Sequence, residues 1–264
     1  MPALLIDDVL GLLSGPGPAG LFSDFDGTLS PIVPDPAAAR PLPGAAEALH
    51  RLATRLAEVA VVSGRPAGFL AGHFAPIEGE RLELFGLHGL ERWGPGGVEP
   101  VEAARPFVEV VAGVRARALE AGIPGLVVED KVLSLTLHWR RARDPEGTGA
   151  AASALALELA AGAGLEVRPG KASVELVPPL GIDKGTVVRE RGRRLAAVVF
   201  LGDDRGDLRA FDALDELERA GAGVARVGVA GAEAPPELLE RADLVLSGPH
   251  ESLALLEALA ARLA

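Results

Sequence analysis

The sequence predicts an α/β fold, with a core built on a parallel β-sheet and a smaller α+β unit inserted into it. Short apolar runs that end at Gly, Pro or Asp alternate with Ala-, Leu- and Arg-rich stretches, as strands alternate with helices around a parallel sheet. The middle of the chain reads instead as helix, hairpin, helix, hairpin, which is typical of an antiparallel unit. The 264 residues, 48% of them hydrophobic, suffice for such a core with one insertion.

The core elements follow from the apolar runs in chain order. The expected strands are Gly20–Phe25, Glu58–Val62, Leu82–Leu87, Ala197–Leu201, Ala225–Val229 and Asp243–Leu246. The expected helices are Gly44–Arg55, Asp207–Ala220, Pro236–Arg241 and His250–Leu263. Ligands of open α/β sheets bind beyond the carboxyl ends of the strands, so we expect a site there.

The inserted unit is expected over residues 98–177, which leaves residues 1–97 and 178–264 as the core. Its expected elements are a helix at Glu102–Ala121, strands at Leu126–Glu129 and Val132–Arg140, a helix at Gly149–Ala161, and strands at Leu165–Arg168 and Ser173–Val177. Breaks rich in Gly and Pro at Gly94–Gly97 and Pro178–Gly181 flank the unit, and we expect hinges there.

Composition excludes several classes of function. A net charge of -11 disfavours nucleic acid and anionic membranes as partners, because both are polyanions. The chain has no Cys, which excludes disulfides and thiolate metal sites. Met1–Leu13 lacks the basic start of a secretory signal, and no apolar run reaches the roughly 18 residues of a membrane span. We therefore expect a soluble, cytoplasmic monomer that acts on a small molecule.

The first candidate motif is Asp24-Phe25-Asp26-Gly27-Thr28, directly after an apolar stretch. Two carboxylates placed two residues apart at the end of a buried strand point into the ligand crevice. Gly27 allows a sharp turn, and Thr28 supplies a hydroxyl and backbone donors. Taken alone, the motif is also compatible with an ordinary turn, since Asp and Gly favour turns.

The second motif is Gly202-Asp203-Asp204, followed by Asp207. Acidic residues at the ends of two neighbouring strands repel each other unless a cation lies between them. Oxygen ligands of this kind suit Mg²⁺. The alternative is helix capping by Asp204 and Asp207, and Asp207 can serve both purposes.

Two further elements supply positive charge and phosphate ligands. Ser63-Gly64-Arg65 offers a hydroxyl and turn amides for a phosphate cradle, although Ser-Gly is also a common loop dipeptide. Lys184 precedes a helical stretch, where it can neutralise the phosphate and the carboxylates; a lysine at such a place is otherwise solvated surface.

In this order the motifs resemble those of the haloacid dehalogenase superfamily of phosphatases, which implies a Rossmann-like core with an inserted α+β cap domain. The resemblance implies that Asp24 is the nucleophile that becomes phospho-aspartate, and that Asp26 is the general acid and then the base. It implies that Ser63 and Lys184 hold the phosphoryl oxygens. The implied cofactor is Mg²⁺, and its implied ligands are Asp24, the backbone carbonyl of Asp26 and Asp203, with Asp204 or Asp207 in or near its shell.

The inserted unit narrows the substrate. In Val132–Arg140 apolar and polar residues alternate, so one face of the strand packs on helices and the other is polar. Alternation alone is equally compatible with a half-solvated sheet. Glu129-Asp130-Lys131, His138-Trp139-Arg140 and Gly170–Glu175 look like the cap of trehalose-6-phosphate phosphatases, and Gly86-Leu87-His88-Gly89 resembles a loop of that family.

This second resemblance implies hydrolysis of trehalose 6-phosphate to trehalose and phosphate. The residues implied to bind the substrate are Thr28, Arg65, His88, Glu129, Lys131, Arg140, Lys171 and Glu175. Taken pair by pair, Glu129 with Lys131 and Lys171 with Glu175 are also compatible with surface ion pairs, each worth about 0–1 kcal/mol.

Some residues depart from the family pattern. Gly206 and Leu208 stand where that family usually has Thr and Glu, so a hydroxyl and a carboxylate are missing near the metal. The chain also lacks Tyr, and Trp139 stands where the family often has Tyr. Two alternatives therefore stay open: a phosphatase for another sugar phosphate, such as sucrose phosphate or a glycosyl-glycerate phosphate, and a non-catalytic regulator that binds a sugar phosphate.

Overall fold

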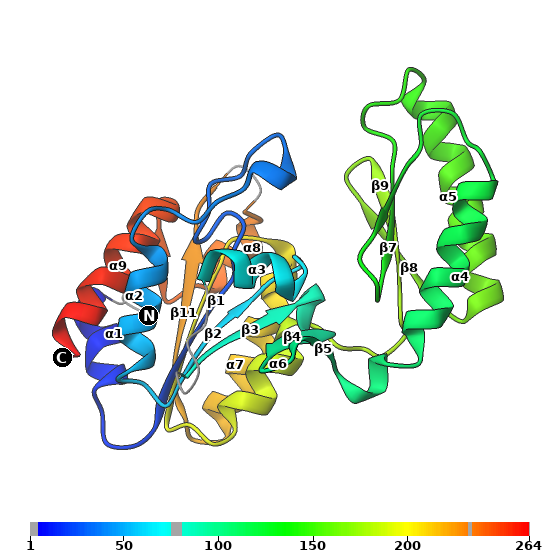
Figure 1. The fold of residues 1–264 in the computed structure, drawn as a ribbon. Helices are drawn as coiled ribbons and strands as arrows, with labels where there is room; N and C mark the ends of the chain where they lie inside the picture. The colour runs from blue at the N-terminus through cyan, green and yellow to red at the C-terminus, as the bar shows by residue number, and fades with distance from the viewer. Residues whose placement is uncertain (1–4, 75–80, 232–233, 264) are drawn as a thin grey trace. The chain divides into compact units, whose positions relative to one another are not determined.

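The computed structural model describes residues 5–74, 81–231 and 234–263. The chain separates into two compact units. The first unit comprises Met1–Glu99 and Ile182–Ala264, and the second comprises Pro100–Gly181. Figure 1 shows each unit built around its own sheet. Among the described residues, no helix combines the length and the apolarity that a membrane span requires.

The first unit contains an eight-stranded sheet in the order β12-β11-β10-β1-β2-β3-β4-β5. Its strands are β1 (Ala19–Ser23), β2 (Glu58–Val62), β3 (Leu82–Gly86), β4 (Glu91–Gly94), β5 (Gly97–Pro100), β10 (Ala197–Gly202), β11 (Gly223–Val229) and β12 (Leu244–Leu246). The pairs from β12 through β3 are parallel, and β4 runs antiparallel to β3. The mixed α/β fold with a largely parallel sheet is therefore confirmed. Because β1 lies at the centre, both of its neighbours end beside it.

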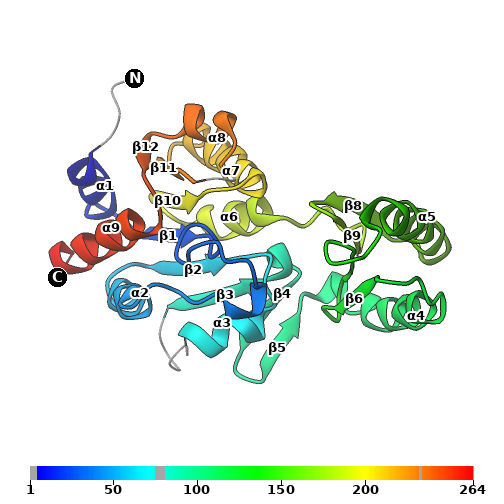
Figure 2. The same cartoon turned by 90° about the horizontal axis from the view of Figure 1, so that it is seen from above.

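Helices cover both faces of this sheet (Figure 2). On one face α1 (Ile6–Leu13), α2 (Ala45–Ala53), α3 (Ala67–Phe74) and α9 (Pro249–Arg262) pack against the strands. On the other face lie α6 (Lys184–Gly192), α7 (Leu208–Arg219) and α8 (Pro236–Arg241). The strands β1 and β10 are buried along their whole length, which explains why their sequences are continuous apolar runs rather than alternating ones.

The first unit contains elements that the sequence did not predict. The helices α1 and α3 are short, and the hairpin β4–β5 extends the sheet at one edge. The segment Gly94–Gly97, interpreted as a break before the inserted unit, is the turn of this hairpin, with Gly97 at φ +100°. Trp93 on β4 is 37% exposed. A turn rich in Gly and Pro serves a hairpin as well as a linker, so composition alone did not separate the two cases.

The second unit is a four-stranded antiparallel sheet in the order β6-β7-β9-β8, with two helices on one face. Its elements are α4 (Phe107–Glu120), β6 (Val127–Asp130), β7 (Leu135–His138), α5 (Pro145–Ala163), β8 (Glu166–Gly170) and β9 (Ser173–Val177). A 3-10 turn at Glu102–Ala104 precedes α4, so the single helix expected over Glu102–Ala121 is interrupted before Phe107. Pro106 accounts for the interruption, because it cannot donate the backbone hydrogen bond that a continuous helix needs there.

The strand expected over Val132–Arg140 is shorter than predicted, because β7 covers only Leu135–His138. Val132 lies in the left-handed region at φ +68°, and the Asp130 carboxylate accepts a hydrogen bond from its amide at 2.8 Å. The first residues of the expected strand therefore belong to the turn. The apolar face of β7 packs on the helices as predicted, and Trp139 packs against the same core. Gly149 on α5 makes room for its indole, since a Cβ there would lie 2.6 Å from Trp139 Nε1.

Candidate functional site

Two carboxylates meet where β1 and β10 end. Ser23 and Leu201 are register partners in the parallel pair, and Asp24 follows the first while Asp203 lies two residues past the second. The Asp24 amide donates to the Leu201 carbonyl at 2.9 Å, which extends the ladder to the site. One carboxylate oxygen each from Asp24, Asp203 and Asp207 lies within 4.8 Å of the other two, and all three residues are buried. The structure thus brings these three predicted residues together.

Lys184 occupies the centre of this acidic cluster. It begins α6, whose N-cap Asp183 accepts a hydrogen bond from the Thr186 amide at 2.9 Å. Its side chain is 2% exposed, and Nζ lies 2.9 Å from Asp24 Oδ1 and 2.7 Å from Asp207 Oδ1. Gly185 lets α6 approach α7 closely, because a Cβ there would lie 2.2 Å from the Arg209 carbonyl oxygen. The lysine is a buried cation of the site, and the solvated-surface interpretation is wrong.

If all the carboxyl groups of the cluster were ionised, they would carry more negative charge than Lys184 neutralises. Burial raises the pKa of Asp24 to about 8, although Lys184 acts in the opposite direction. Burial, and then the charges of Asp207 and Asp204, raise the pKa of Asp203 to about 7. Burial works against the charged form of Lys184 as well, but the carboxylates outweigh it and raise the pKa of Lys184 well above its ordinary value. These shifts identify a place where an additional cation would be strongly stabilised.

The donor set fits Mg²⁺. All side-chain ligand atoms offered by the cluster are carboxylate oxygens, which Mg²⁺ prefers. Within the described part of the chain, Asp24 uses one oxygen on Lys184, and Asp203 uses one to accept from the Thr28 hydroxyl at 3.1 Å. Each keeps a second oxygen for a ligand. The two carboxylates that the sequence placed on either side of the ion are therefore near enough to share one.

Asp207 contributes to the site by holding other groups in place. Its Oδ2 accepts from the amides of Asp203 and Asp204 at 2.9 Å each, and its Oδ1 accepts from Lys184. Both oxygens are therefore engaged within the protein. Asp204 caps the 3-10 turn η4 (Arg205–Asp207) by accepting from the Asp207 amide at 3.1 Å, and its side chain is 47% exposed. Capping, the alternative considered for this pair, is thus observed.

Thr28 and Gly27 shape the space around Asp203. Gly27 has φ +76°, and a Cβ at this position would lie 1.9 Å from Asp203 Oδ2. Only glycine leaves that carboxylate in place while also adopting the left-handed turn. The Thr28 hydroxyl, expected to contact substrate, donates to Asp203 in this structure. Gly27 and Thr28, which follow β1, therefore position the carboxylate of Asp203, which follows β10.

Ser63 follows β2, the strand on the other side of β1. It is 1% exposed, and its Oγ accepts from the Arg65 amide at 3.2 Å, so its hydroxyl proton remains available to donate. His88 lies against this turn: its amide donates to the Ser63 carbonyl at 2.8 Å, and a Cβ on Gly64 would lie 2.8 Å from its imidazole. Leu87 and His88 both adopt the left-handed backbone conformation in this turn, with φ of 49° and 59°. Ser63 and His88 thus form one turn structure.

Asp26, although only two residues from Asp24, faces a different partner. Both of its oxygens accept from the guanidinium of Arg65, with Nε–Oδ2 and Nη2–Oδ1 distances of 2.7 Å. Its side chain is 30% exposed, whereas that of Asp24 is 4% exposed. The pairing joins two residues predicted for separate tasks, general acid catalysis and substrate binding.

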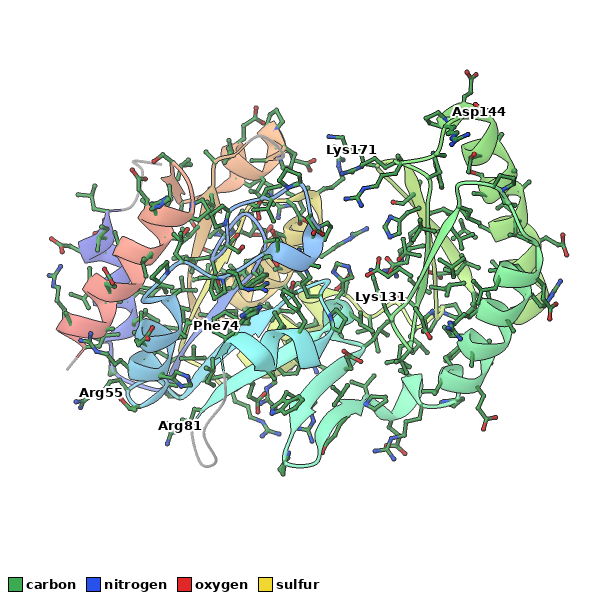
Figure 3. The ribbon with its side chains drawn as sticks, turned by 45° about the horizontal axis from the view of Figure 1, so that its top comes forward. Arg55, Phe74, Arg81, Lys131, Asp144 and Lys171 are labelled. Atoms are coloured by element: carbon green, nitrogen blue, oxygen red, sulfur yellow. The ribbon has the colours of Figure 1, made fainter. Side chains whose placement is uncertain are left out.

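The polar residues of the second unit gather on the face of its sheet turned away from α4 and α5, where Figure 3 labels Lys131 and Lys171. Lys131 Nζ donates to Glu175 Oε1 at 3.1 Å, and Glu129 Oε2 lies 2.7 Å from His138 Nε2. Lys131 and Glu175, which belong to different pairs in the interpretation of the sequence, thus contact each other across the strands. The cross-strand pairs bring residues of both hairpins onto one surface.

Three residues of β7 and its approach complete this polar face and were not assigned to the site from the sequence. Ser134 donates to Glu175 at 2.8 Å, and His138 contacts Glu129. Thr136 lies in register between Glu129 and Glu175, and its buried hydroxyl has no hydrogen-bond partner among the described residues. The period-two alternation of β7 was the signal that could have identified them.

Arg140 and Lys171 lie together at the other end of this face. Arg140 Nη2 donates to the Lys171 carbonyl at 3.4 Å, and Ala172 beside it lies at φ +53° in the β8–β9 turn. Both side chains are exposed. The five residues of the second unit that the resemblance implies to bind substrate therefore belong to one surface: Glu129, Lys131, Arg140, Lys171 and Glu175.

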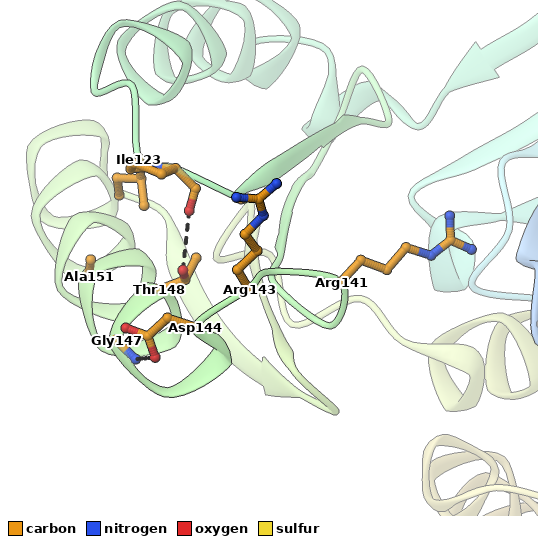
Figure 4. Close-up of a pocket in the computed structure, with 9 residues that line it drawn as sticks. Ile123, Arg141, Arg143, Asp144, Gly147, Thr148 and Ala151 are labelled. Atoms are coloured by element: carbon orange, nitrogen blue, oxygen red, sulfur yellow. Dashed lines mark hydrogen bonds between the residues drawn. The ribbon is translucent and has the colours of Figure 1, made fainter.

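A pocket of about 670 Å³ lies elsewhere in the second unit, beside the start of α5. Figure 4 shows Arg141 and Arg143 at its border, and both are exposed. The Thr148 hydroxyl donates to the Pro124 carbonyl, and the Gly147 amide donates to Asp144. Because its donors serve local turns and none of the predicted site residues lines it, this recess is separate from the candidate site.

The chain is similar to known phosphatases, which agrees with the geometry of the candidate site. A family model described as trehalose-phosphatase matches residues 22–235. A trehalose-phosphate phosphatase of Mycolicibacterium paratuberculosis is 41% identical over 214 residues, which are 76% of this chain and 52% of that protein. One from Mycobacterium leprae is 36% identical over 217 residues, or 76% of this chain and 49% of that protein. The chain spans about half the length of these curated relatives.

A solved structure shares the fold over nearly the entire chain. The C-terminal domain of the Candida albicans trehalose-6-phosphate phosphatase superposes with a TM-score of 0.72 at 27% identity, and the match covers 98% of each chain. The fold with a parallel sheet and a separate antiparallel sheet is thus that of a known group of phosphatase structures.

Proposed function

The chain belongs to the trehalose-phosphatase family, and on this premise we propose that it hydrolyses trehalose 6-phosphate to trehalose and phosphate through a phospho-aspartate on Asp24. The observation that carries the proposal is the buried cluster of Asp24, Asp203 and Asp207 around Lys184 at the carboxyl ends of β1 and β10. Such a cluster combines a nucleophile, a fixed cation and ligands for a divalent ion in one place.

In the first half-reaction a carboxylate oxygen of Asp24 attacks phosphorus. The new bond joins Asp24 to phosphorus, and the bond between phosphorus and the sugar oxygen breaks. Asp26 gives its proton to that oxygen, so that trehalose leaves as a neutral alcohol. Lys184 Nζ, 2.9 Å from Asp24 Oδ1, counters the negative charge that gathers between carboxylate and phosphate. Ser63 has a hydroxyl proton to donate to a phosphoryl oxygen.

In the second half-reaction water replaces Asp24. Asp26, now a carboxylate, takes a proton from water while the water oxygen attacks phosphorus. The bond between Asp24 and phosphorus breaks, phosphate leaves, and Asp24 returns to its starting form. Over both steps one water is consumed and Asp26 ends protonated as it began, so the cycle balances.

Mg²⁺ is the cofactor that we propose for the cluster. Asp24 and Asp203 would hold it with the backbone carbonyl of Asp26, and bound there it supplies positive charge that lets an anionic carboxylate approach an anionic phosphate. Asp207 supports the ion indirectly, since its two oxygens fix Lys184 and the amides of Asp203 and Asp204.

The second unit is proposed as the cap that recognises the sugar. Its polar face holds Glu129, Lys131 and Glu175 in cross-strand contacts, and carboxylate and ammonium groups can each bond more than one hydroxyl of a polyol. Arg140 and Lys171 extend the same face. We propose that these side chains exchange their present partners for the hydroxyls of the disaccharide.

A panel of phosphate esters tests the proposal. Phosphate release is measured for trehalose 6-phosphate, sucrose 6-phosphate, a glycosyl-glycerate phosphate and glucose 6-phosphate, with Mg²⁺ and with a chelator. We expect trehalose 6-phosphate to have the highest kcat/KM and the chelator to stop turnover. Preference for another ester would assign a different sugar phosphatase, and binding without turnover would indicate a regulator.

Asp24→Asn tests the covalent step. The variant should lose turnover by about a thousandfold or more, because a neutral amide is a poor nucleophile at phosphorus. Asp144→Asn is the matched control: Asp144 caps α5 in the second unit, and Asn is an equally good cap. Acid quenching followed by mass spectrometry should find phosphate on Asp24 in the wild type. Phosphate on another residue, or full activity of Asp24→Asn, would refute the mechanism.

A further inference from the structure

Arg65 holds Asp26 with two parallel hydrogen bonds. The Nε–Oδ2 and Nη2–Oδ1 distances are both 2.7 Å, the side-by-side arrangement in which guanidinium and carboxylate fit best. The arginine side chain is 19% exposed and that of Asp26 is 30% exposed, so water competes only partly for these bonds. Two bonds in one plane define the plane and the direction of the carboxyl group, which one bond to a lysine cannot do.

The guanidinium is itself fixed from two other directions. Its Nη1 donates to the Pro36 carbonyl at 2.7 Å, in the 3-10 turn η1 (Pro36–Ala38). Its carbon lies 4.9 Å from the centre of the Phe69 ring on α3, a cation–π distance. Phe69 in turn meets Phe25 edge to face at 5.7 Å, and Phe25 is the residue between Asp24 and Asp26. The contacts form a closed circuit that begins and ends at the nucleophile's own loop.

This geometry differs from that expected of a substrate ligand. An arginine that binds phosphate directs its fork at the phosphate position, whereas the fork of Arg65 is directed at Asp26. The backbone of Arg65 takes part in the turn as well, since its amide donates to Ser63 Oγ at 3.2 Å and its carbonyl accepts from the Leu87 amide at 3.0 Å. Arg65 therefore connects the Ser63 turn with Asp26, the proposed general acid and base.

We infer that Arg65 is a positioning residue for Asp26, which it keeps pointed at the leaving oxygen and then at the attacking water. The inference rests on the proposed function, because it needs Asp26 to act as acid and base. Protonation of one Asp26 oxygen weakens the bond that this oxygen accepts from Arg65, but the other oxygen still accepts from the guanidinium, and the Pro36 and Phe69 contacts keep the guanidinium in place. A general acid held in one direction needs no search for its target during the reaction.

The dependence of rate on the leaving group distinguishes this role from phosphate binding. A sugar alcohol leaves poorly and needs the proton of Asp26, whereas p-nitrophenolate leaves well without one. The measured quantity is kcat/KM, which reports the steps up to release of the alcohol and therefore excludes the later attack of water. We expect Arg65→Ala to lower kcat/KM for trehalose 6-phosphate by about 100-fold and for p-nitrophenyl phosphate by less than about 10-fold.

Two further measurements support the assignment. Arg65→Lys keeps the charge but lacks the fork, so it should recover less than a tenth of the lost kcat/KM on the sugar phosphate. Added guanidinium ion should restore part of the activity of Arg65→Ala on the sugar phosphate only. Arg189→Ala is the matched control. It removes another two-bond pair, which Arg189 on α6 makes with Glu216 on α7, and it should leave kcat/KM for both substrates unchanged.

The outcomes separate three roles. Equal losses on both substrates, with an unchanged melting temperature, would overturn the inference and make Arg65 a phosphate ligand. Equal losses with a lowered melting temperature would overturn it in favour of a structural role. If the wild type prefers another alkyl phosphate to trehalose 6-phosphate, the proposed substrate fails, and the comparison is made between that ester and p-nitrophenyl phosphate. The role of Arg65 is therefore tested whichever sugar phosphate the enzyme takes.

Discussion

Replacing Asp24, the proposed nucleophile, should make the metal-free protein more stable. Asp24 is 4% exposed, and burial raises its pKa from 3.8 to about 8 against the attraction of Lys184. The folded state therefore binds a proton at Asp24 more readily than the unfolded state does. Stability conferred by such a group falls as the pH rises from about 4 to about 8, because unfolding then releases the proton and exposes the carboxylate to water. Asp24→Asn removes this opposition to folding.

The magnitude follows from the shift. The two pKa values differ by about 4 units, and each unit corresponds to about 1.4 kcal/mol. The gain from Asp24→Asn is therefore at most about 6 kcal/mol above pH 8, about 4 kcal/mol at pH 7 and about 2 kcal/mol at pH 5. The loss of a charged partner for Lys184 reduces these figures, since the amide oxygen attracts the ammonium less strongly.

Urea unfolding in a chelator at pH 5, 6, 7 and 8 measures the effect. The free energy of unfolding is compared between the wild type, Asp24→Asn and the control Asp144→Asn, whose replacement caps α5 equally well. The difference between Asp24→Asn and the wild type should be positive and should grow with pH. A difference that is negative at pH 8, or that does not change with pH, would refute the electrostatic description of the cluster.

Three more predictions concern single side chains. Gly27→Ala should abolish phosphate release and lower the melting temperature, because its Cβ would lie 1.9 Å from the Asp203 carboxylate. The control Gly72→Ala lies on α3, where a Cβ meets nothing within 4 Å, and it should raise the free energy of unfolding by about 1 kcal/mol. Glu175→Ala should raise KM for trehalose 6-phosphate at least tenfold and leave KM for p-nitrophenyl phosphate within about twofold; equal effects in the two assays would argue against sugar recognition by the cap. Thr136→Val removes a buried hydroxyl that has no partner among the described residues, so its urea midpoint should rise, by about 1 kcal/mol in stability, and a lowered midpoint would mean that the hydroxyl is satisfied in solution.

The carboxylate cluster of the candidate site could be predicted because its residues lie directly after apolar runs. The two central strands are buried on both faces, so apart from Ser23 at the end of β1 they contain no polar side chain, and the first carboxylates beyond them are those of Asp24 and Asp203. The expectation that both motifs serve one cation also predicted that these strands are neighbours, and the parallel pairing of β1 with β10 agrees with it. The local sequence therefore predicts where each of these two strands ends.

The pairing of charged side chains could not be predicted in the same way. Asp26 and Arg65 are 39 residues apart, and Lys131 and Glu175 are 44 apart. The first pair depends on where the turn after β2 places a long side chain, and the second on the cross-strand register of β6, β7 and β9. Neither is a property of a short segment. The interpretation of Gly94–Gly97 as a break before the inserted unit missed the β4–β5 hairpin for a related reason: only the tertiary structure shows that the segments on both sides pair.

The position of Trp139 above Gly149 has a spectroscopic consequence. The chain contains two tryptophans and no tyrosine, and the other tryptophan, Trp93, belongs to β4 of the first unit. Each unit therefore carries its own intrinsic fluorophore, free of background from phenol side chains. Trp93→Phe leaves an emission that reports only on the second unit, and Trp139→Phe leaves one that reports only on the first unit. The order in which the two units melt can thus be followed by fluorescence without attaching a dye.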